Sequence, residues 1–533
     1  MPGHLELLIF GLLMAVAVLV GLSRLFRVPY PVFLVIGGLL LSLVPGLPTV
    51  ELPPDLVFLI FLPPLLYVAA FFSSPLDLKA NLRPIGLLSI GLVLITAGCV
   101  ASVAHLALGL PWSVAFVLGV IVAPTDPVAV TATASLLSLP RRIVTILEGE
   151  SLINDGLALT LYRTAVATAV AGIFSLFDAG LQLVLSGIGG VAIGLLVGWV
   201  ISRVRRQTED AFLETTIALF TGYAAYLPAE ELGASGILAV VAAGLYLSWQ
   251  SPLMSSARNR LQVFEVLWVM GFLLNSVLFV LIGLQLHTVL EGVSDRSTIT
   301  LVLFAALISL AVMAIRALSV FPMAYLPRRL SYRLRQRDPL PPWQELVVVA
   351  YGGMRGAISL ALALSLPLAT QSGASFPERD LIIFLTFGVI LVTLVLQGLS
   401  LPLLIRWLGL EVGAAEGQEM AEARLRAAEA ALSRLEELRD EEWVPEDAAQ
   451  RLREVYEFRR QRFATQLNEQ AENGQQGEDY EQHSQAFGHL RRELLAAERE
   501  ALLELRDEGR ISDEVRGHVE RDLDLEEARL ELI

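Results

Sequence analysis

The chain has little cysteine and little charge for its length. Its 533 residues include one cysteine, Cys99, which excludes an intramolecular disulfide and gives no signal of a metal site. Only 17% of the residues are charged, whereas 55% are hydrophobic and the mean hydropathy is +0.62. The sequence also lacks a phosphate-binding loop, a nucleophilic triad and a nucleic-acid-binding patch. We therefore expect a membrane protein rather than an enzyme, with no cofactor and no nucleic-acid partner.

The charge is distributed unevenly along the chain. Residues 411–533 contain 17 Arg, no Lys and 33 Asp plus Glu, a net charge of −16, whereas residues 1–410 carry 22 basic and 21 acidic residues. This asymmetry predicts a transmembrane domain over residues 1–410 and an acidic, soluble helical domain over residues 411–533.

Apolar stretches long enough to cross roughly 30 Å of hydrocarbon recur throughout the first domain. We identify thirteen, near residues 4–23, 29–46, 53–72, 84–108, 112–138, 143–173, 178–202, 209–228, 231–249, 262–288, 298–325, 344–367 and 379–407. The first has no basic start and no cleavage site, so we interpret it as a retained span rather than a signal peptide. The sequence thus predicts an all-α, polytopic fold with about 13 transmembrane helices.

The loops between these stretches alternate in charge. Arginine and lysine gather in every second loop, for example at Lys79, Arg141 and Arg258 and in the dense run Arg328–Arg337. The positive-inside rule then places the N-terminus outside and the acidic domain in the cytoplasm, with the protein in the cell inner (plasma) membrane.

Three charged residues lie deep inside apolar stretches: Asp126, Asp155 and Arg355. A carboxylate at the centre of a membrane helix costs about 2.5–3.5 kcal/mol or more, so such residues usually serve a function. At about 1.5 Å per residue, they lie roughly 21, 18 and 16 Å along their spans. All three therefore fall near the middle of the membrane, which indicates a pathway for ions or protons.

The sixth stretch carries four polar residues at helical spacing. Ser151 and Asp155 share one face, and Glu150 and Asn154 share the adjacent one. A hydroxyl one turn from a carboxylate can supply two oxygens to a hard monovalent cation. A hydrogen bond from Ser151 to a carbonyl of its own helix is the alternative.

The fifth and twelfth stretches both contain helix-breaking residues. Pro124 and Pro127 enclose two polar residues and leave carbonyls without helical partners, which predicts a cavity-lining break or, alternatively, a simple kink. Glycines on both sides of Arg355 allow close approach of another backbone. The guanidinium of Arg355 needs a buried anion, and we predict that Glu150 provides it.

Topology adds a further prediction. Stretches 1–6 and 8–13 could form two six-helix halves of opposite orientation, with the seventh between them. The interrupted stretches are then the fifth helix of each half, a pattern that marks transporter binding sites.

Three motifs carry a resemblance to a known family. They are Pro124-Thr125-Asp126-Pro127-Val128-Ala129, Glu148-Gly149-Glu150-Ser151-Leu152-Ile153-Asn154-Asp155-Gly156 and Tyr351-Gly352-Gly353-Met354-Arg355-Gly356-Ala357. Through them, about residues 5–410 resemble the monovalent cation:proton antiporters of family 1, the sodium/proton exchangers of bacteria and animals. The resemblance implies a thirteen-span homodimer among membrane lipids that exchanges Na⁺, or else Li⁺ or K⁺, for H⁺ by an elevator-like motion.

The resemblance also assigns roles to residues. It implies that Asp155 binds both the cation and the proton, and that Glu150 and Arg355 form a structural ion pair. The residues it implies around Asp155 are Thr125, Asp126, Ser151 and Asn154. Those it implies as ligands of Na⁺ are Asp155, Ser151 and Thr125. Asn154 beside Asp155 implies electroneutral, one-for-one exchange. Val68 stands where many relatives have an acid, so the third span lacks that carboxylate.

Other buried polar residues have two interpretations each. Arg163 and Arg316 could tune the site or exclude divalent ions, or could bond helix-end carbonyls or Asp126. Asn275 could stabilise a helix crossing or bridge helices.

The expected mechanism is competition for one carboxylate, because protonated Asp155 offers a cation neither charge nor a full set of oxygens. If only the neutralised site crosses the apolar barrier, exchange becomes obligatory. The alternatives are a K⁺/H⁺ antiporter of the same family, a cation channel or uniporter, a symporter that binds an organic anion near Arg355, and a membrane-tethered sensor.

The acidic domain reads as helices near residues 421–441, 446–467, 480–508 and 512–530, separated by a stop at Val444–Pro445 and a loop at 473–477. Leucine stripes predict a small bundle or helices paired across a dimer. It is either a helical appendage that aids assembly or a sensor, with His483, His489 and His518 as candidates for detecting pH.

Overall fold

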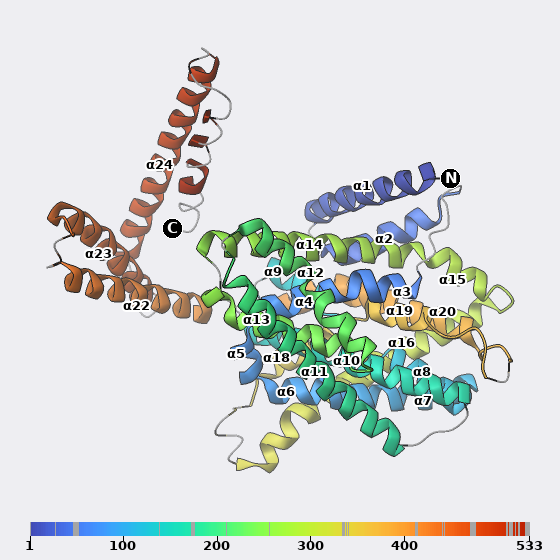
Figure 1. Cartoon of the computed structure of the whole chain (residues 1–533). Coiled ribbons are helices and arrows are strands. Elements are labelled where there is room, and N and C mark those ends of the chain that lie inside the picture. The colour runs from blue at the N-terminus through green and yellow to red at the C-terminus, as the bar shows by residue number, and fades with distance from the viewer. Residues whose placement is uncertain are drawn as a thin grey trace. The chain divides into compact units, whose positions relative to one another are not determined.

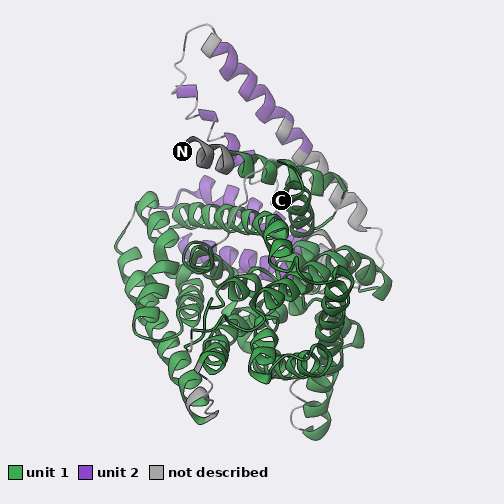
Figure 2. Cartoon of the chain, turned by 90° about the vertical axis from the view of Figure 1, so that its right-hand side faces the viewer, with its two compact units in different colours: residues 1–410 green, residues 411–533 purple. Residues whose placement is uncertain are grey.

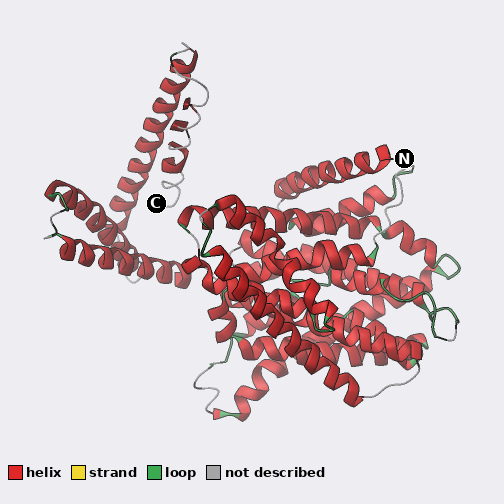
Figure 3. Ribbon diagram, in the orientation of Figure 1, coloured by secondary structure: helices red, strands yellow, loops and turns green. Residues whose placement is uncertain are grey.

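A computed structural model divides the chain into two compact units, residues 1–410 and 411–533 (Figure 2). The structure describes residues 2–26, 28–45, 53–137, 139–171, 176–208, 210–254, 256–332, 336, 338, 340–371, 373–410, 414–439, 441, 443–469, 476–507, 510, 515–516, 519–520 and 523–527. Within these residues every element is a helix, apart from an isolated bridge between Ala369 and Ser375 (Figure 3). The predicted all-α class is confirmed.

The first unit begins with helices that include two π-helical segments, η1 and η2. In chain order they are α1 (Pro2–Phe26), α2 (Tyr30–Ser42), α3 (Pro54–Leu56), η1 (Val57–Phe61), α4 (Leu62–Phe72), α5 (Pro75–Ala80), α6 (Leu82–Gly86), η2 (Leu87–Leu92), α7 (Val93–Leu108), α8 (Trp112–Ile121), α9 (Val128–Leu137) and α10 (Arg141–Ala171).

The remaining helices of this unit include a third π-helical segment, η3. They are α11 (Leu176–Arg205), α12 (Ala211–Glu231), α13 (Gly236–Met254), α14 (Ala257–Leu284), α15 (Leu286–Gly292), α16 (Thr298–Leu330), α18 (Trp343–Tyr351), α19 (Ala357–Leu364), α20 (Arg379–Leu391), η3 (Val392–Gln397) and α21 (Gly398–Leu408).

Many of these helices suit a membrane. Within the described residues, seven are long and apolar enough to cross one: Pro54–Phe72, Leu82–Leu108, Gly180–Arg205, Gly236–Met254, Ala257–Gly292, Thr298–Leu330 and Arg379–Leu408. Shorter apolar helices add to them. Helix is present in each of the thirteen predicted stretches. The number of crossings and the inverted halves remain predictions.

The first unit contains two groups of packed helices. In group A, α11 packs on α13, α13 on α4, and α2 on α14, with α1 along α2 and α14 (Figure 1). In group B, α8 packs on α7 and α10, while α16 packs on α7, α18 and α20. Small residues allow the closest contact in group A. A Cβ on Gly194 of α11 would lie 2.1 Å from the carbonyl oxygen of Ala239 in α13, and one on Gly190 would lie 2.4 Å from that of Ser235, just before α13.

Both predicted interruptions are present in group B. The chain leaves the helix between α8 and α9, at residues 122–127, and again between α18 and α19, at residues 352–356. The two breaks meet, because the amide of Asp126 donates a hydrogen bond to the carbonyl of Met354 at 2.8 Å.

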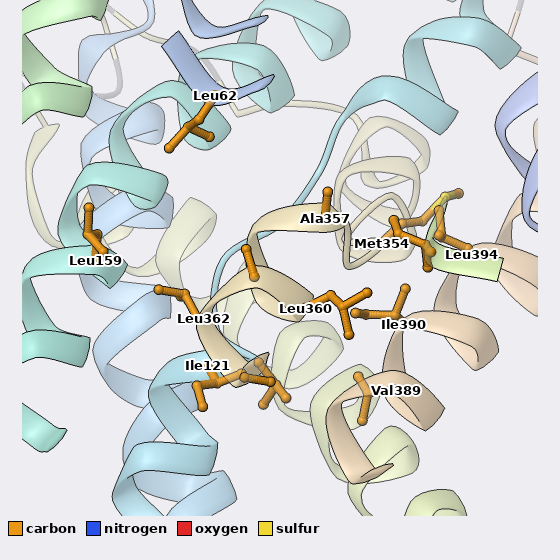
Figure 4. Close-up of a cluster of buried hydrophobic side chains, with 14 of the residues drawn as sticks. Leu62, Ile121, Leu159, Met354, Ala357, Leu360, Leu362, Val389, Ile390 and Leu394 are labelled. Carbon is orange, nitrogen blue, oxygen red and sulfur yellow. The ribbon is translucent and has the colours of Figure 1, made fainter. Parts of the chain in front are cut away.

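Apolar packing holds the second break in place. In Figure 4, Leu360 of α19 and Ile390 of α20 point toward one another, and Met354 lies near Leu394 of η3. All four side chains are fully buried. This packing is what fixes the backbone that carries Arg355.

The second unit consists of helices as well. They are α22 (Ala414–Leu438), α23 (Glu446–Glu469) and α24 (Gln476–Asp507). α22 packs on α23 through small side chains, with Ala421, Ala428 and Ala449 buried. The predicted helix at 512–530 falls largely outside the described residues, as do residues 473–475 of the predicted loop and the side chains of His483 and His518. The loop prediction is wrong for residues 476 and 477, which begin α24.

Candidate functional site

Arg355 closes the end of a broken helix. Its Nη1 donates to the carbonyls of Ala123, at 2.5 Å, and Pro124, at 2.9 Å. The Ala123 carbonyl is the one that Pro127 deprives of a helical partner, so the guanidinium replaces the missing amide. The backbone amide of Arg355 donates to Thr393 at 3.1 Å. The positively charged guanidinium of Arg355 thus lies at the C-terminal end of α8, where the helix dipole favours a positive charge.

Asp126 occupies the beginning of the next half-helix. Its Oδ1 accepts a hydrogen bond from the amide of Val128 at 3.0 Å, which caps α9 and places a negative charge at that N-terminus. A Cβ on Gly356 would lie 2.0 Å from Oδ2 of Asp126. Glycine at position 356 is therefore required for the carboxylate to lie against the second break.

The buried ion pair of the site differs from the predicted one. Glu150 pairs with Arg316 of α16, with Nη1–Oε1 at 2.5 Å and Nη2–Oε2 at 2.8 Å. Arg316 also donates to the carbonyl of Val349. The predicted pairing of Glu150 with Arg355 is wrong in this structure, because the carbonyls of the first break bind the Arg355 guanidinium instead.

Space for Arg316 comes from the glycine motif. A Cβ on Gly353 would lie 2.2 Å from Cδ and from Nε of Arg316. The missing side chain lets Arg316 pass over the second break and reach α10. The glycine-rich motif therefore accommodates a neighbouring side chain as well as a neighbouring backbone.

A hydrogen-bonded chain joins α10 to the first break. Nδ2 of Asn154 donates to Thr125 Oγ1 at 2.9 Å, and Thr125 donates to Glu150 Oε1 at 3.2 Å. Thr125, Glu150 and Asn154 are all buried, and Arg316 continues the chain. The hydroxyl of Thr125 thus both donates and accepts a hydrogen bond within the protein, and Thr125 also lines the cavity described next.

Asp155 faces a cavity of about 460 Å³, together with Thr125, Asp126 and Ser151. The hydroxyl of Ser151 lies beside the Asp155 carboxylate, on the same helix face, as its spacing predicts. Asp155 itself is only 4% exposed. Four of the predicted site residues are therefore gathered on one wall.

The opposite wall is largely apolar and comes from group A. It contains Tyr30 and Trp268, both packed on Phe272, and Asn275 lies beside them. Val68 also lines this wall, so no third-span acid reaches the cavity at that position. The cavity consequently lies between group A and group B, with its charged residues on group B.

Arg163 lies elsewhere. Its Nη2 pairs with Glu230 Oε2 at 2.5 Å, joining α10 to α12, and both side chains are partly exposed. Of the three additional candidates, Arg316 is thus part of the buried network and Asn275 lines the cavity. Arg163 does not line the cavity and pairs with Glu230 instead.

One cavity residue was missed by the sequence reasoning. Glu148 lines the cavity beside Ser151 and Asp155. The signal was available, because residues 148, 151 and 155 have the i, i+3, i+7 spacing of a single helix face.

The chain matches known proteins over most of its length. A family model described as the transmembrane sodium/hydrogen exchanger matches residues 11–407. The chain belongs to the sodium/hydrogen exchanger family. It is 36% identical to an uncharacterized Na⁺/H⁺ exchanger of Mycobacterium tuberculosis, over 98% of this chain and 97% of that protein.

Two further similarities agree with this family. The Na⁺/H⁺ antiporter ApNhaP of Aphanothece halophytica is 36% identical over 80% of each chain. The sodium proton antiporter MjNhaP1 of Methanocaldococcus jannaschii has the same fold, with a TM-score of 0.58 and 20% identity over 76% of this chain and 99% of that one. The predicted family is confirmed, and the chain is a multi-pass membrane transporter of the antiporter type.

Proposed function

We propose that this exchanger is a secondary active antiporter that moves Na⁺ against H⁺ through competition for Asp155. The observation that carries the proposal is the placement of Asp155 in the cavity between the two helix groups. No arginine, lysine or histidine lines this cavity among the described residues. An unneutralised carboxylate at this depth suits a cation pathway.

The oxygens around Asp155 fit a hard monovalent cation. Sodium loses water on entering and needs oxygen ligands together with negative charge. Asp155 provides both, Ser151 adds a hydroxyl oxygen, and Thr125 lines the same cavity. A proton on Asp155 removes the charge, so proton and cation exclude one another.

The neighbouring residues support electroneutral, one-for-one exchange. Asn154 adds no charge beside Asp155, and the charge of Glu150 is balanced by Arg316. Asp126 is held at the start of α9 by the amide of Val128. Asp155 is then the carboxylate whose charge alternates between proton and cation.

The arrangement of helices supports an elevator-type cycle. The charged wall of the cavity belongs to group B and the apolar wall to group A. Movement of group B along that apolar wall would carry Asp155 from one side of the membrane to the other only when its charge is neutralised. We further propose a homodimer in the plasma membrane, with the N-terminus outside and residues 411–533 forming a cytoplasmic domain.

Proton flux in reconstituted vesicles tests this function. A gradient of Na⁺, Li⁺ or K⁺ is imposed, the internal pH is followed by a dye, and the membrane potential is clamped by an ionophore. We expect Na⁺ to drive proton movement that clamping does not change, because no net charge moves. Dependence on the membrane potential would contradict electroneutral exchange, and a response to K⁺ alone would favour K⁺/H⁺ exchange.

Substitution of Asp155 in the same vesicle assay tests the role of the central carboxylate. Asp155→Asn should reduce cation-driven proton movement to that of protein-free vesicles, whereas Cys99→Ser, at an exposed position, should retain the wild-type rate. Full exchange by Asp155→Asn would end the proposal. A current without proton flux would indicate a channel, and transport that needs an organic solute would indicate a symporter.

A further inference from the structure

Glu148 is a carboxylate of the cavity that the exchange mechanism above does not use. It lies in α10 and lines the same cavity as Ser151 and Asp155. Seven residues separate it from Asp155, which corresponds to about 10 Å along the helix. It lies on the side of Asp155 where α10 begins, at Arg141.

The surroundings of Glu148 do not neutralise it. Within the described part of the chain, its side chain forms no hydrogen bond or ion pair, whereas Glu150, two residues away, is paired with Arg316. The side chain is also only partly exposed. A structural carboxylate inside a membrane protein is normally paired, so an unpaired one needs another explanation.

The charge of the whole cavity gives that explanation. Its lining contains the carboxylates Asp126, Glu148 and Asp155 and, among the described residues, no basic side chain. A cleft lined by charges of one sign, with low-dielectric walls, raises the local concentration of counter-ions and their rate of arrival by about 10–1,000-fold. Of the two carboxylates on α10, Glu148 is nearer than Asp155 to the end at which the helix begins.

We propose that Glu148 is a positioning residue that attracts monovalent cations from the cytoplasmic side and passes them to Asp155. This inference rests on the proposed exchange at Asp155 and adds a defined route of access to it. Glu148 acts on the supply of cation and not on the exchange step itself. Its removal therefore changes the apparent affinity for the cation on one face and leaves the maximal rate unchanged.

Membrane vesicles of defined orientation test the proposal. In everted vesicles the added Na⁺ meets the cytoplasmic face, and the apparent KM and maximal rate are obtained from the dequenching of a pH-sensitive dye. We expect Glu148→Gln to raise the apparent KM about tenfold, at the lower end of the effect of such focusing. Glu148→Asp should restore most of the affinity, and right-side-out vesicles should show no change in KM.

The control removes an equal charge outside the cavity. Glu265 lies exposed on α14 and does not line the cavity, so Glu265→Gln should leave both kinetic parameters unchanged. An unchanged cytoplasmic KM in Glu148→Gln, an equal shift on both faces, or a fall in maximal rate alone would overturn the proposal. Loss of exchange by the wild type would instead contradict the proposed function.

Discussion

Arg316 and Arg355 satisfy two different needs of the same site. Arg355 binds the carbonyls of the first break, and Arg316 neutralises Glu150. Both guanidiniums are buried, at 1% and 2% exposure for Arg355 and Arg316 respectively. Each is therefore held by partners that water cannot replace, and loss of either partner leaves a buried group unsatisfied.

Single and double substitutions separate the roles of the two arginines. Arg316→Met should destabilise the protein by about 3–5 kcal/mol, because Glu150 is left buried without its counter-charge. Adding Glu150→Gln should recover much of that loss. The same addition to Arg355→Met should recover little, since Arg355 binds carbonyls. Thermal unfolding of the purified protein in detergent measures the stability of all four variants. If Glu150→Gln stabilised the Arg355→Met variant but not the Arg316→Met variant, the assignment would be reversed.

Depth and helical spacing predicted most of the site at the residue scale. They placed Asp126, Asp155 and Arg355 at one level, and the structure brings these residues together around the two breaks. They chose the wrong partner for Glu150, which pairs with Arg316 and not with Arg355. That pairing depends on the free carbonyl of Ala123, which attracts one guanidinium, and on the space above Gly353, which admits the other.

At the scale of elements, group A and group B are joined by contacts that an elevator motion would have to break. The ion pair of Arg163 with Glu230 is one of them, because α10 belongs to group B and α12 packs on α13 of group A. Glu230 also accepts a hydrogen bond from the amide of Gly236, which holds it at the α12–α13 turn. An exposed ion pair contributes only about 0–1 kcal/mol, so this contact can open during each cycle.

A cross-link at this position tests the motion of α10 against α12. In a Cys99→Ser background, Arg163→Cys combined with Glu230→Cys should lose exchange after treatment with a short, cleavable bifunctional thiol reagent. Cleavage of the reagent should restore the rate, and each single cysteine should remain active after the same treatment. Undiminished exchange by the cross-linked protein, with cross-linking verified by mass spectrometry, would contradict movement between the two groups.

At the scale of the whole molecule, composition predicted helices and a change in character near residue 410, and the described chain divides into units at that position. The breaks at Pro124–Pro127 and around Arg355 were also predictable, because proline and glycine act locally. The division of the first unit into groups A and B was not, since it depends on long-range contacts such as that of α2 with α14. Without that division, the cavity and the place of Glu148 in it could not be derived.

The central claim is that cation and proton compete for one carboxylate, and the pH dependence of the apparent KM for Na⁺ tests it most directly. A cation that binds only the deprotonated site should show a KM that rises about tenfold for each unit of decreasing pH on the acidic side, with a constant maximal rate. Reconstituted wild-type protein, assayed with Na⁺ over a range of concentrations at each pH, provides both parameters. A KM that does not depend on pH, with a maximal rate that falls as the pH is lowered, would contradict competition at Asp155.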